Sequence, residues 1–169
     1  MRSLCGRSIS GNVRGAGDAR GVRRTTLDRP TGGGIVPLMV KVTVEYQGDL
    51  HCTVRHGPSG ATFETDAPVD NQGKGEAFSP TDLVGAAMGS CMATIMGIYA
   101  RTKGIHLEGL RIEVTKEMTP PPRRIGRLTT DIWMPAGLAH DPGLEEAALT
   151  CPVHRSLALE VEKPVNFHW

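Results

Sequence analysis

Three short segments have the alternation of polar and apolar residues that is typical of β-strands. Val40–Tyr46 and Leu50–His56 carry apolar side chains at every second position over most of their length, as strands with one buried face do. Gly48–Asp49 supplies a turn between them, and the turn Gly57–Gly60 precedes a third, shorter strand at Ala61–Thr65. Together these segments predict an antiparallel sheet of three consecutive strands.

The period of the pattern changes to that of a helix after residue 78. Ser79–Asp82 predicts a helix start, with Ser at the N-cap, Pro at the first helical position and an acid at the third. We expect the helix to run to about Lys103 and to end at Gly104. Leu83–Ala100 contains no charged residue, so we expect this helix to be buried on all sides.

Glycines and methionines recur within the predicted helix. Because glycine in a helix interior costs up to about 1 kcal/mol relative to alanine, we expect the glycines to let another backbone come close. Methionines spaced four residues apart are interpreted as core packing. The glycines are Gly85, Gly89 and Gly97, and the methionines are Met88, Met92 and Met96.

The second half of the sequence predicts two strands, a helix and a last strand. Leu110–Met118 and Ile125–Met134 are expected to pair antiparallel. Asp141 caps a second helix that Pro152 interrupts, and a strand follows near Val161–Phe167. The order βββ-α-ββ-α-β predicts an α+β fold, with a largely antiparallel sheet, a long buried central helix and a second helix.

The first 38 residues differ in composition from the rest of the chain. They hold seven Arg, two Asp and no Lys, Glu or aromatic residue, a net charge of +5, together with eight of the 21 glycines. Such a segment buries too little apolar surface to offset the entropy cost of ordering it. We therefore expect residues 1–38 to be a disordered extension, with translation from Met39 as the alternative, and residues 39–169 to form a single domain.

Charge and composition disfavour several classes of function. The 169 residues carry 19 Lys and Arg against 18 Asp and Glu and only seven aromatic residues, so we expect no nucleic-acid binding. We expect no membrane insertion, because no uninterrupted apolar run approaches the roughly 18–20 residues that cross a bilayer. The basic N-terminal segment lacks the apolar stretch of a secretion signal, and we expect a cytoplasmic protein.

Two of the four cysteines lie on the predicted helices. Cys91 falls in the middle of the long helix, and Cys151 lies near the helix restart, where free N–H groups favour a thiolate. Either cysteine alone is compatible with a buried core residue. As a pair they suit a dithiol/disulfide couple, in which one thiolate reduces a hydroperoxide and becomes a sulfenic acid that condenses with the second thiol.

Other residues of the chain offer different chemistry. Cys52, Cys91, Cys151 and His154 offer a Cys₃His set for zinc. A second short-spaced motif, which structural zinc sites normally show, is missing, so we expect neither a metal nor a cofactor. Asp82 is a candidate catalytic acid or an orienter of a basic group, although its place in the capping box explains it without a catalytic role.

The two cysteine-containing motifs together resemble the OsmC/Ohr family. Phe78–Cys91 matches its Pro-led helix with the reactive cysteine, and Cys151–His154, about sixty residues later, matches its Cys-Pro resolving motif. The resemblance covers about residues 40–167. It implies an intertwined homodimer with active sites at the subunit interface, and thiol-dependent reduction of organic hydroperoxides with a lipoyl-type or similar dithiol as reductant.

Carried over by position, the resemblance makes Cys91 peroxidatic and Cys151 resolving. Peroxidase members place Glu directly after the helix-leading Pro, whereas Thr81 stands here and Asp82 follows it. They also use an Arg from the N-terminal strands to stabilise the thiolate, and Arg55 is the nearest basic residue to that place. Two alternatives stay open: a non-enzymatic module of this fold that binds a small apolar ligand, and a structural zinc protein.

Overall fold

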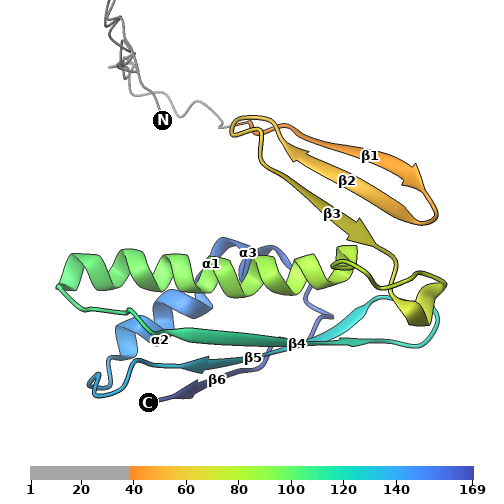
Figure 1. The fold of residues 1–169 in the computed structure, drawn as a ribbon. Helices are drawn as coiled ribbons and strands as arrows, with labels where there is room; N and C mark the ends of the chain where they lie inside the picture. The colour runs from red at the N-terminus through yellow and green to blue at the C-terminus, as the bar shows by residue number, and fades with distance from the viewer. Residues whose placement is uncertain (1–38) are drawn as a thin grey trace, which may run out of the picture. The chain divides into compact units, whose positions relative to one another are not determined.

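The computed structural model describes residues 39–169 (Figure 1). The expected disorder of residues 1–38 falls outside the described residues. The elements follow the predicted order of strands and helices, with one addition, a 3₁₀ turn at Val69–Asn71. The interruption predicted at Pro152 divides the second helix into two, the later of which is short. The α+β class is therefore confirmed.

The strands form two separate sheets of three. The first contains β1 (Val42–Gly48), β2 (His51–His56) and β3 (Thr62–Asp66), paired antiparallel in that order. Val54 of β2 lies opposite Val44 on one side and Phe63 on the other. This sheet is the three-stranded meander that the alternating pattern predicts.

The second sheet is mixed rather than purely antiparallel. β4 (Arg111–Met118) pairs antiparallel with β5 (Ile125–Trp133), and β6 (Val165–His168) adds parallel to β5. The parallel pairing is possible because α2 (Pro142–Leu149) and α3 (Pro152–Ser156) form the crossover between β5 and β6.

The long helix α1 (Pro80–Lys103) begins and ends where the sequence predicts. The Ser79 side chain accepts a hydrogen bond from the backbone of Asp82, whose carboxylate accepts one from the Ser79 N–H, so the capping box is complete. At the other end Gly104 adopts a left-handed conformation with φ of 69°, which glycine adopts without steric cost.

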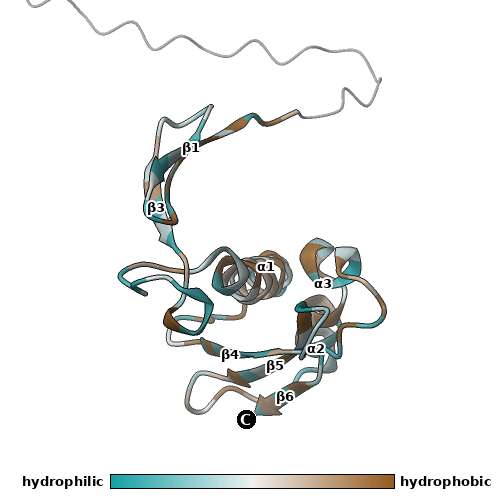
Figure 2. Cartoon of the chain, turned by 90° about the vertical axis from the view of Figure 1, so that its right-hand side faces the viewer, coloured by the Kyte–Doolittle hydropathy of each residue, from teal (hydrophilic) through white to brown (hydrophobic). Residues whose placement is uncertain are grey.

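The core lies where α1 and α2 pack on the β4–β6 sheet. Figure 2 shows α1 over one face of this sheet, with α2 and α3 beside it. The predicted packing role of the methionines is confirmed, since all three are 0 % exposed. They pack in one cluster with buried residues of β5 and α2, which are Leu128, Ile132, Leu144 and Ala148.

The expectation that α1 is buried on all sides is wrong for residues 39–169. Ala86, Ser90, Thr94 and Ile98 lie exposed along one side of the helix, because the sheet, α2 and α3 cover only the other side.

The expectation that no apolar segment approaches membrane-spanning length is also wrong. By length and composition alone α1 could span a membrane, since its glycines, serine and threonines are uncharged. Its packing, however, is that of a core helix.

The helix glycines contact side chains rather than another backbone. A Cβ at Gly89 would lie 3.2 Å from the Val114 side chain of β4, and one at Gly85 would lie 3.4 Å from the same residue. Around Gly97 the described chain has nothing within 4 Å. The predicted close approach therefore occurs at Gly85 and Gly89, where α1 contacts side chains of the sheet, but not at Gly97.

The β1–β3 sheet makes few contacts with the rest of the described chain. The side chains of Val42, Val44, Tyr46 and Phe63 are between 47 % and 64 % exposed. Strands with this alternation normally bury one face. The sheet thus presents an apolar surface that residues 39–169 do not cover.

Candidate functional site

Cys91 and Cys151 lie side by side although sixty residues separate them in the sequence. Cys91 is half-buried in the middle of α1 and packs against the core. Cys151 is the N-cap of α3 and is 0 % exposed. Both cysteines carry free thiols, and the Cys91 thiol is close enough to Cys151 to perturb it through hydrogen bonding and charge.

Burial dominates the protonation of Cys151. Desolvation raises the pKa of the Cys151 thiol, and the neighbouring Cys91 raises it further. The backbone N–H of His154 donates to the Cys151 sulfur at 3.3 Å and lowers this pKa, but by less than burial raises it. The sequence predicted that the helix restart favours a thiolate at Cys151. This prediction is wrong, because the sum of these effects raises the pKa of Cys151.

The zinc hypothesis gains no support from the arrangement. Cys52 lies in β2, paired with Tyr46 and Thr65. Cys91 lies in α1, whereas Cys151 is the N-cap of α3 and His154 lies within α3. Within residues 39–169 no cluster of three or more Cys, His, Asp or Glu side chains is arranged to hold a metal ion. Burial, followed by the charge of Lys163, lowers the pKa of His154, so its imidazole is neutral at pH 7.

Asp82 lies away from both cysteines of the same chain. It is nine residues before Cys91, which corresponds to about 13.5 Å along the helix axis and about half a turn around it. Its carboxylate accepts hydrogen bonds from the Ser79 N–H at 2.8 Å and from the Lys116 Nζ at 2.5 Å. Burial raises the pKa of Asp82, but these hydrogen bonds outweigh it and leave the pKa lowered.

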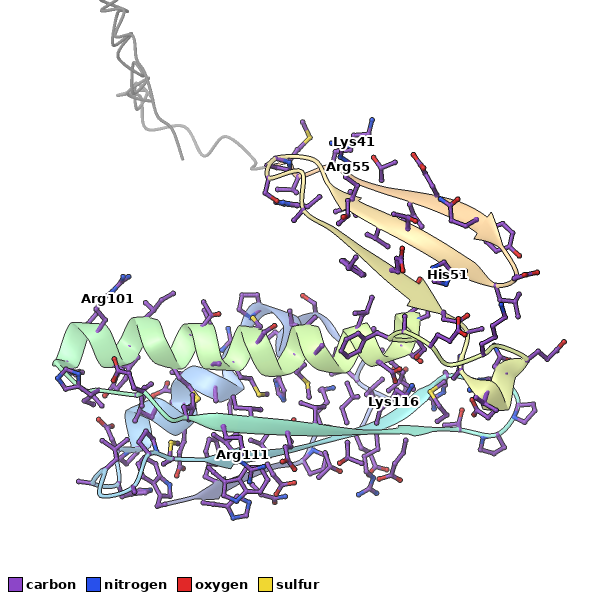
Figure 3. All side chains as sticks on the ribbon, viewed as in Figure 1. Lys41, His51, Arg55, Arg101, Arg111 and Lys116 are labelled. Carbon is purple, nitrogen blue, oxygen red and sulfur yellow. The ribbon has the colours of Figure 1, made fainter. Side chains whose placement is uncertain are left out.

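Lys116 is a polar residue of the α1–β4 contact that the sequence reasoning missed. Its ammonium group also donates to Thr81 Oγ1 at 2.8 Å, and its side chain is only 17 % exposed. Figure 3 shows it on β4 near the start of α1. A signal existed, because Lys116 shares the inward-facing alternation of Ile112 and Val114.

Arg55 is not brought to the cysteines by the described part of this chain. It lies in β2, opposite Thr43 and Thr62, with an exposed side chain (Figure 3). No hydrogen bond or ion pair within residues 39–169 joins it to Cys91 or Cys151. Of the four predicted site residues, the fold therefore brings together the two cysteines and leaves Arg55 and Asp82 elsewhere.

Comparisons with known proteins agree with this architecture. The family model described as OsmC-like protein matches residues 73–163, which include both cysteines. A solved structure described as a putative osmotic stress induced and detoxification response protein of Psychrobacter arcticus is 43 % identical. The similarity covers 77 % of this chain and 96 % of that one, with a TM-score of 0.71.

More distant structures share the fold. An OsmC-like protein of Mycoplasma pneumoniae is 15 % identical over 76 % of this chain and 95 % of that one, with a TM-score of 0.66. An organic hydroperoxide resistance protein of Bacillus subtilis is 18 % identical over 76 % and 97 % of the two chains, with a TM-score of 0.56. Among curated proteins, no sequence matches. The matched family model and the 43 % identical structure show that the chain belongs to the OsmC-like protein family.

Proposed function

We propose that this protein reduces organic hydroperoxides through a redox couple of Cys91 and Cys151. The observation that carries the proposal is the placement of two free thiols side by side with different exposure: Cys91 is half-buried, whereas Cys151 is fully buried. Because a peroxide reaches a partly exposed sulfur more readily, Cys91 is the attacking residue and Cys151 the resolving one.

The cycle balances with a dithiol as reductant. The Cys91 thiolate attacks the outer oxygen of ROOH, the O–O bond breaks, and protonation releases ROH while Cys91 becomes a sulfenic acid. The Cys151 thiol then displaces water from that sulfenic acid to form the Cys91–Cys151 disulfide. A lipoyl-type or similar dithiol transfers two electrons and two protons back, which restores both thiols and leaves the reductant as a disulfide.

The raised pKa of Cys151 suits the resolving role. A thiol that stays protonated at neutral pH does not compete for peroxide, and it reacts once the sulfenic acid forms beside it. Two adjacent free thiols also fit a compartment that keeps thiols reduced, so we place the protein in the cytoplasm.

We further propose a homodimer. Within the described residues β4 lies at one edge of its sheet, β1 and β3 at the edges of the other, and the apolar face of β1–β3 is uncovered. A groove of about 620 Å³ between α1 and β4 is lined mostly by small and apolar residues. A second copy offers surfaces that cover these regions, and Arg55 of the partner subunit is the cation we propose to place near Cys91.

Turnover of cumene hydroperoxide with dihydrolipoamide tests the catalytic assignment. Cys91→Ser should abolish peroxide consumption, because no sulfenic acid can form. Cys151→Ser should stop turnover after one cycle and leave a sulfenic acid at Cys91 that dimedone traps. Cys52→Ser is the matched control and should retain turnover, since Cys52 lies in β2.

Two results would contradict the proposal. Undiminished consumption by Cys91→Ser would exclude the attacking role of that residue. Saturable binding of a small apolar molecule by the wild type and by the double cysteine variant, with no peroxide turnover in either, would instead favour the binding-module alternative.

A further inference from the structure

The sulfur atom of Cys151 has a structural role besides its proposed redox role. Cys151 is the N-cap of α3, and its Sγ accepts a hydrogen bond from the backbone N–H of His154 at 3.3 Å. An N-cap side chain satisfies one of the N–H groups that the first turn of a helix leaves without a partner. The same atom therefore closes the first turn of α3 and forms the proposed disulfide with Cys91.

The helix α3 is short and weakly anchored, so it depends on this cap. It has five residues, and none of them is buried. Val153 and the following Leu157 pack against the core while remaining partly exposed. Helices of this length are unstable in water without packing or capping. Loss of the hydrogen bond to Cys151 therefore has a larger effect on α3 than on a long helix of the core.

Formation of a disulfide requires one of the two cysteines to move. Both are free thiols, and a disulfide holds its sulfur atoms about 2.05 Å apart, so the two atoms have to approach each other. Cys91 lies in the middle of α1, which has 24 residues, a cap at each end and several buried residues in the core. Figure 2 shows α3 as the shorter helix beside it. Because α1 is the more firmly held of the two, Cys151 and α3 are the side that moves.

The segment that can move has a firm anchor at each end. Before it, α2 is held by its three buried residues in the core. After it, the Glu162 N–H donates to the Gly126 carbonyl and the Glu162 carbonyl accepts from the Leu128 N–H, both at 2.9 Å. Residues 151–161 lie between these anchors and include Leu159, whose side chain is 95 % exposed. A movement of Cys151 is therefore confined to this segment and leaves the sheet in place.

We propose that formation of the Cys91–Cys151 disulfide withdraws the cap of α3 and opens residues 151–161. The inference rests on the redox couple of the proposed function. Two S–H bonds break and one S–S bond forms, while the hydroperoxide accepts the two electrons and two protons and leaves as an alcohol and water. The opening uncovers Cys151, which is 0 % exposed in the dithiol form, and gives the dithiol reductant access to the disulfide. Reduction returns the sulfur of Cys151 to the His154 N–H and closes the segment again.

Hydrogen exchange of the α3 amides tests this opening without peroxide chemistry. The full-length protein is compared by mass spectrometry before and after treatment with diamide, an azo compound that takes two hydrogens from a pair of thiols and becomes a hydrazine. Peptide mapping establishes the link between Cys91 and Cys151. The amides of His154, Arg155 and Leu157 should exchange about 5-fold faster or more in the linked protein, as expected for a lost cap. The amides of α2 should keep their exchange rates.

Two variants separate the effect of the disulfide from that of the oxidant. Cys91→Ser keeps the cap at Cys151 and cannot form the link, so diamide should leave the exchange of α3 unchanged. Cys151→Ser places a hydroxyl group, which is a favourable N-cap, at the start of α3. It should therefore keep slow exchange both before and after diamide.

The possible outcomes distinguish this inference from the peroxidase assignment. Equal exchange of α3 in the dithiol and linked proteins would overturn the inference, and so would a failure of diamide to link the two cysteines. Faster exchange in the linked protein, with no consumption of cumene hydroperoxide, would support the opening and refute the peroxidase. Consumption of cumene hydroperoxide with unchanged exchange would support the peroxidase and refute the opening.

Discussion

Replacing Asp82 separates a structural role from a catalytic one. The Asp82 carboxylate closes the capping box with Ser79 and pairs with Lys116. Asp82→Ala removes the hydrogen-bond acceptor and the charge together. Asp82→Asn keeps an acceptor for the Ser79 N–H and removes only the charge, so the two variants separate these contributions.

The expected loss follows from three contacts. A missing cap interaction costs about 1 kcal/mol, and a lost negative charge in the first helical turn costs about 0.5 kcal/mol. The ion pair with Lys116 adds about 0.5 kcal/mol, since Asp82 is 41 % exposed and solvent screens the pair. Asp82→Ala should therefore lower the free energy of unfolding by about 2 kcal/mol, and Asp82→Asn by about 1 kcal/mol.

Urea denaturation at pH 7 and at low pH measures both effects. The pKa of Asp82 is lowered in the folded protein, so its stabilisation is fully present above the pKa of the unfolded chain. It is lost as the pH falls through the folded-state pKa. The difference between wild type and Asp82→Asn should shrink over that acidic window.

Peroxide turnover completes the test. A structural Asp82 predicts that Asp82→Asn retains turnover within about threefold when measured per folded molecule, because the side chain lies about half a turn away from Cys91. Unchanged stability combined with a loss of turnover of about 100-fold or more, which is typical of a removed general acid, would refute the structural assignment.

Three further predictions concern the core, the helix glycines and the resolving cysteine. Met92→Ala should lower the free energy of unfolding by about 2–5 kcal/mol in urea titrations, because Met92 is 0 % exposed. Gly97→Ala should raise the free energy of unfolding by up to about 1 kcal/mol, because no described atom lies within 4 Å of the added Cβ. Gly143→Ala should lower the free energy of unfolding, because the added Cβ would clash with the Tyr99 side chain. Because the pKa of Cys151 is raised, stopped-flow measurement should show disulfide formation still accelerating above pH 9; a plateau below pH 8 would contradict the burial effect.

Local features of the fold were readable from the sequence because their causes are local. Ser79, Pro80 and Gly104 mark the ends of α1 through hydrogen bonds and backbone preferences that involve only neighbouring residues. The alternation at Val42 and Val44 likewise predicts β1. These elements agree with the structure within one or two residues.

Non-local features escaped the same reasoning. The parallel addition of β6 depends on the path of α2 and α3 across the sheet, which no local pattern encodes. The apolar composition of α1 predicted burial on all sides, but composition does not say which surface covers each side. Sequence suggested that Cys91 and Cys151 act together, and only the packing of α1 against α3 brings them side by side.

Peptide mass spectrometry after treatment with one equivalent of cumene hydroperoxide tests the central claim most directly. The full-length protein should lose two hydrogens and yield a peptide pair linked through Cys91 and Cys151, while Cys52 remains a free thiol. Oxidation that leaves these two cysteines unlinked, or that modifies Cys52 first, would contradict a redox couple at the junction of α1 and α3.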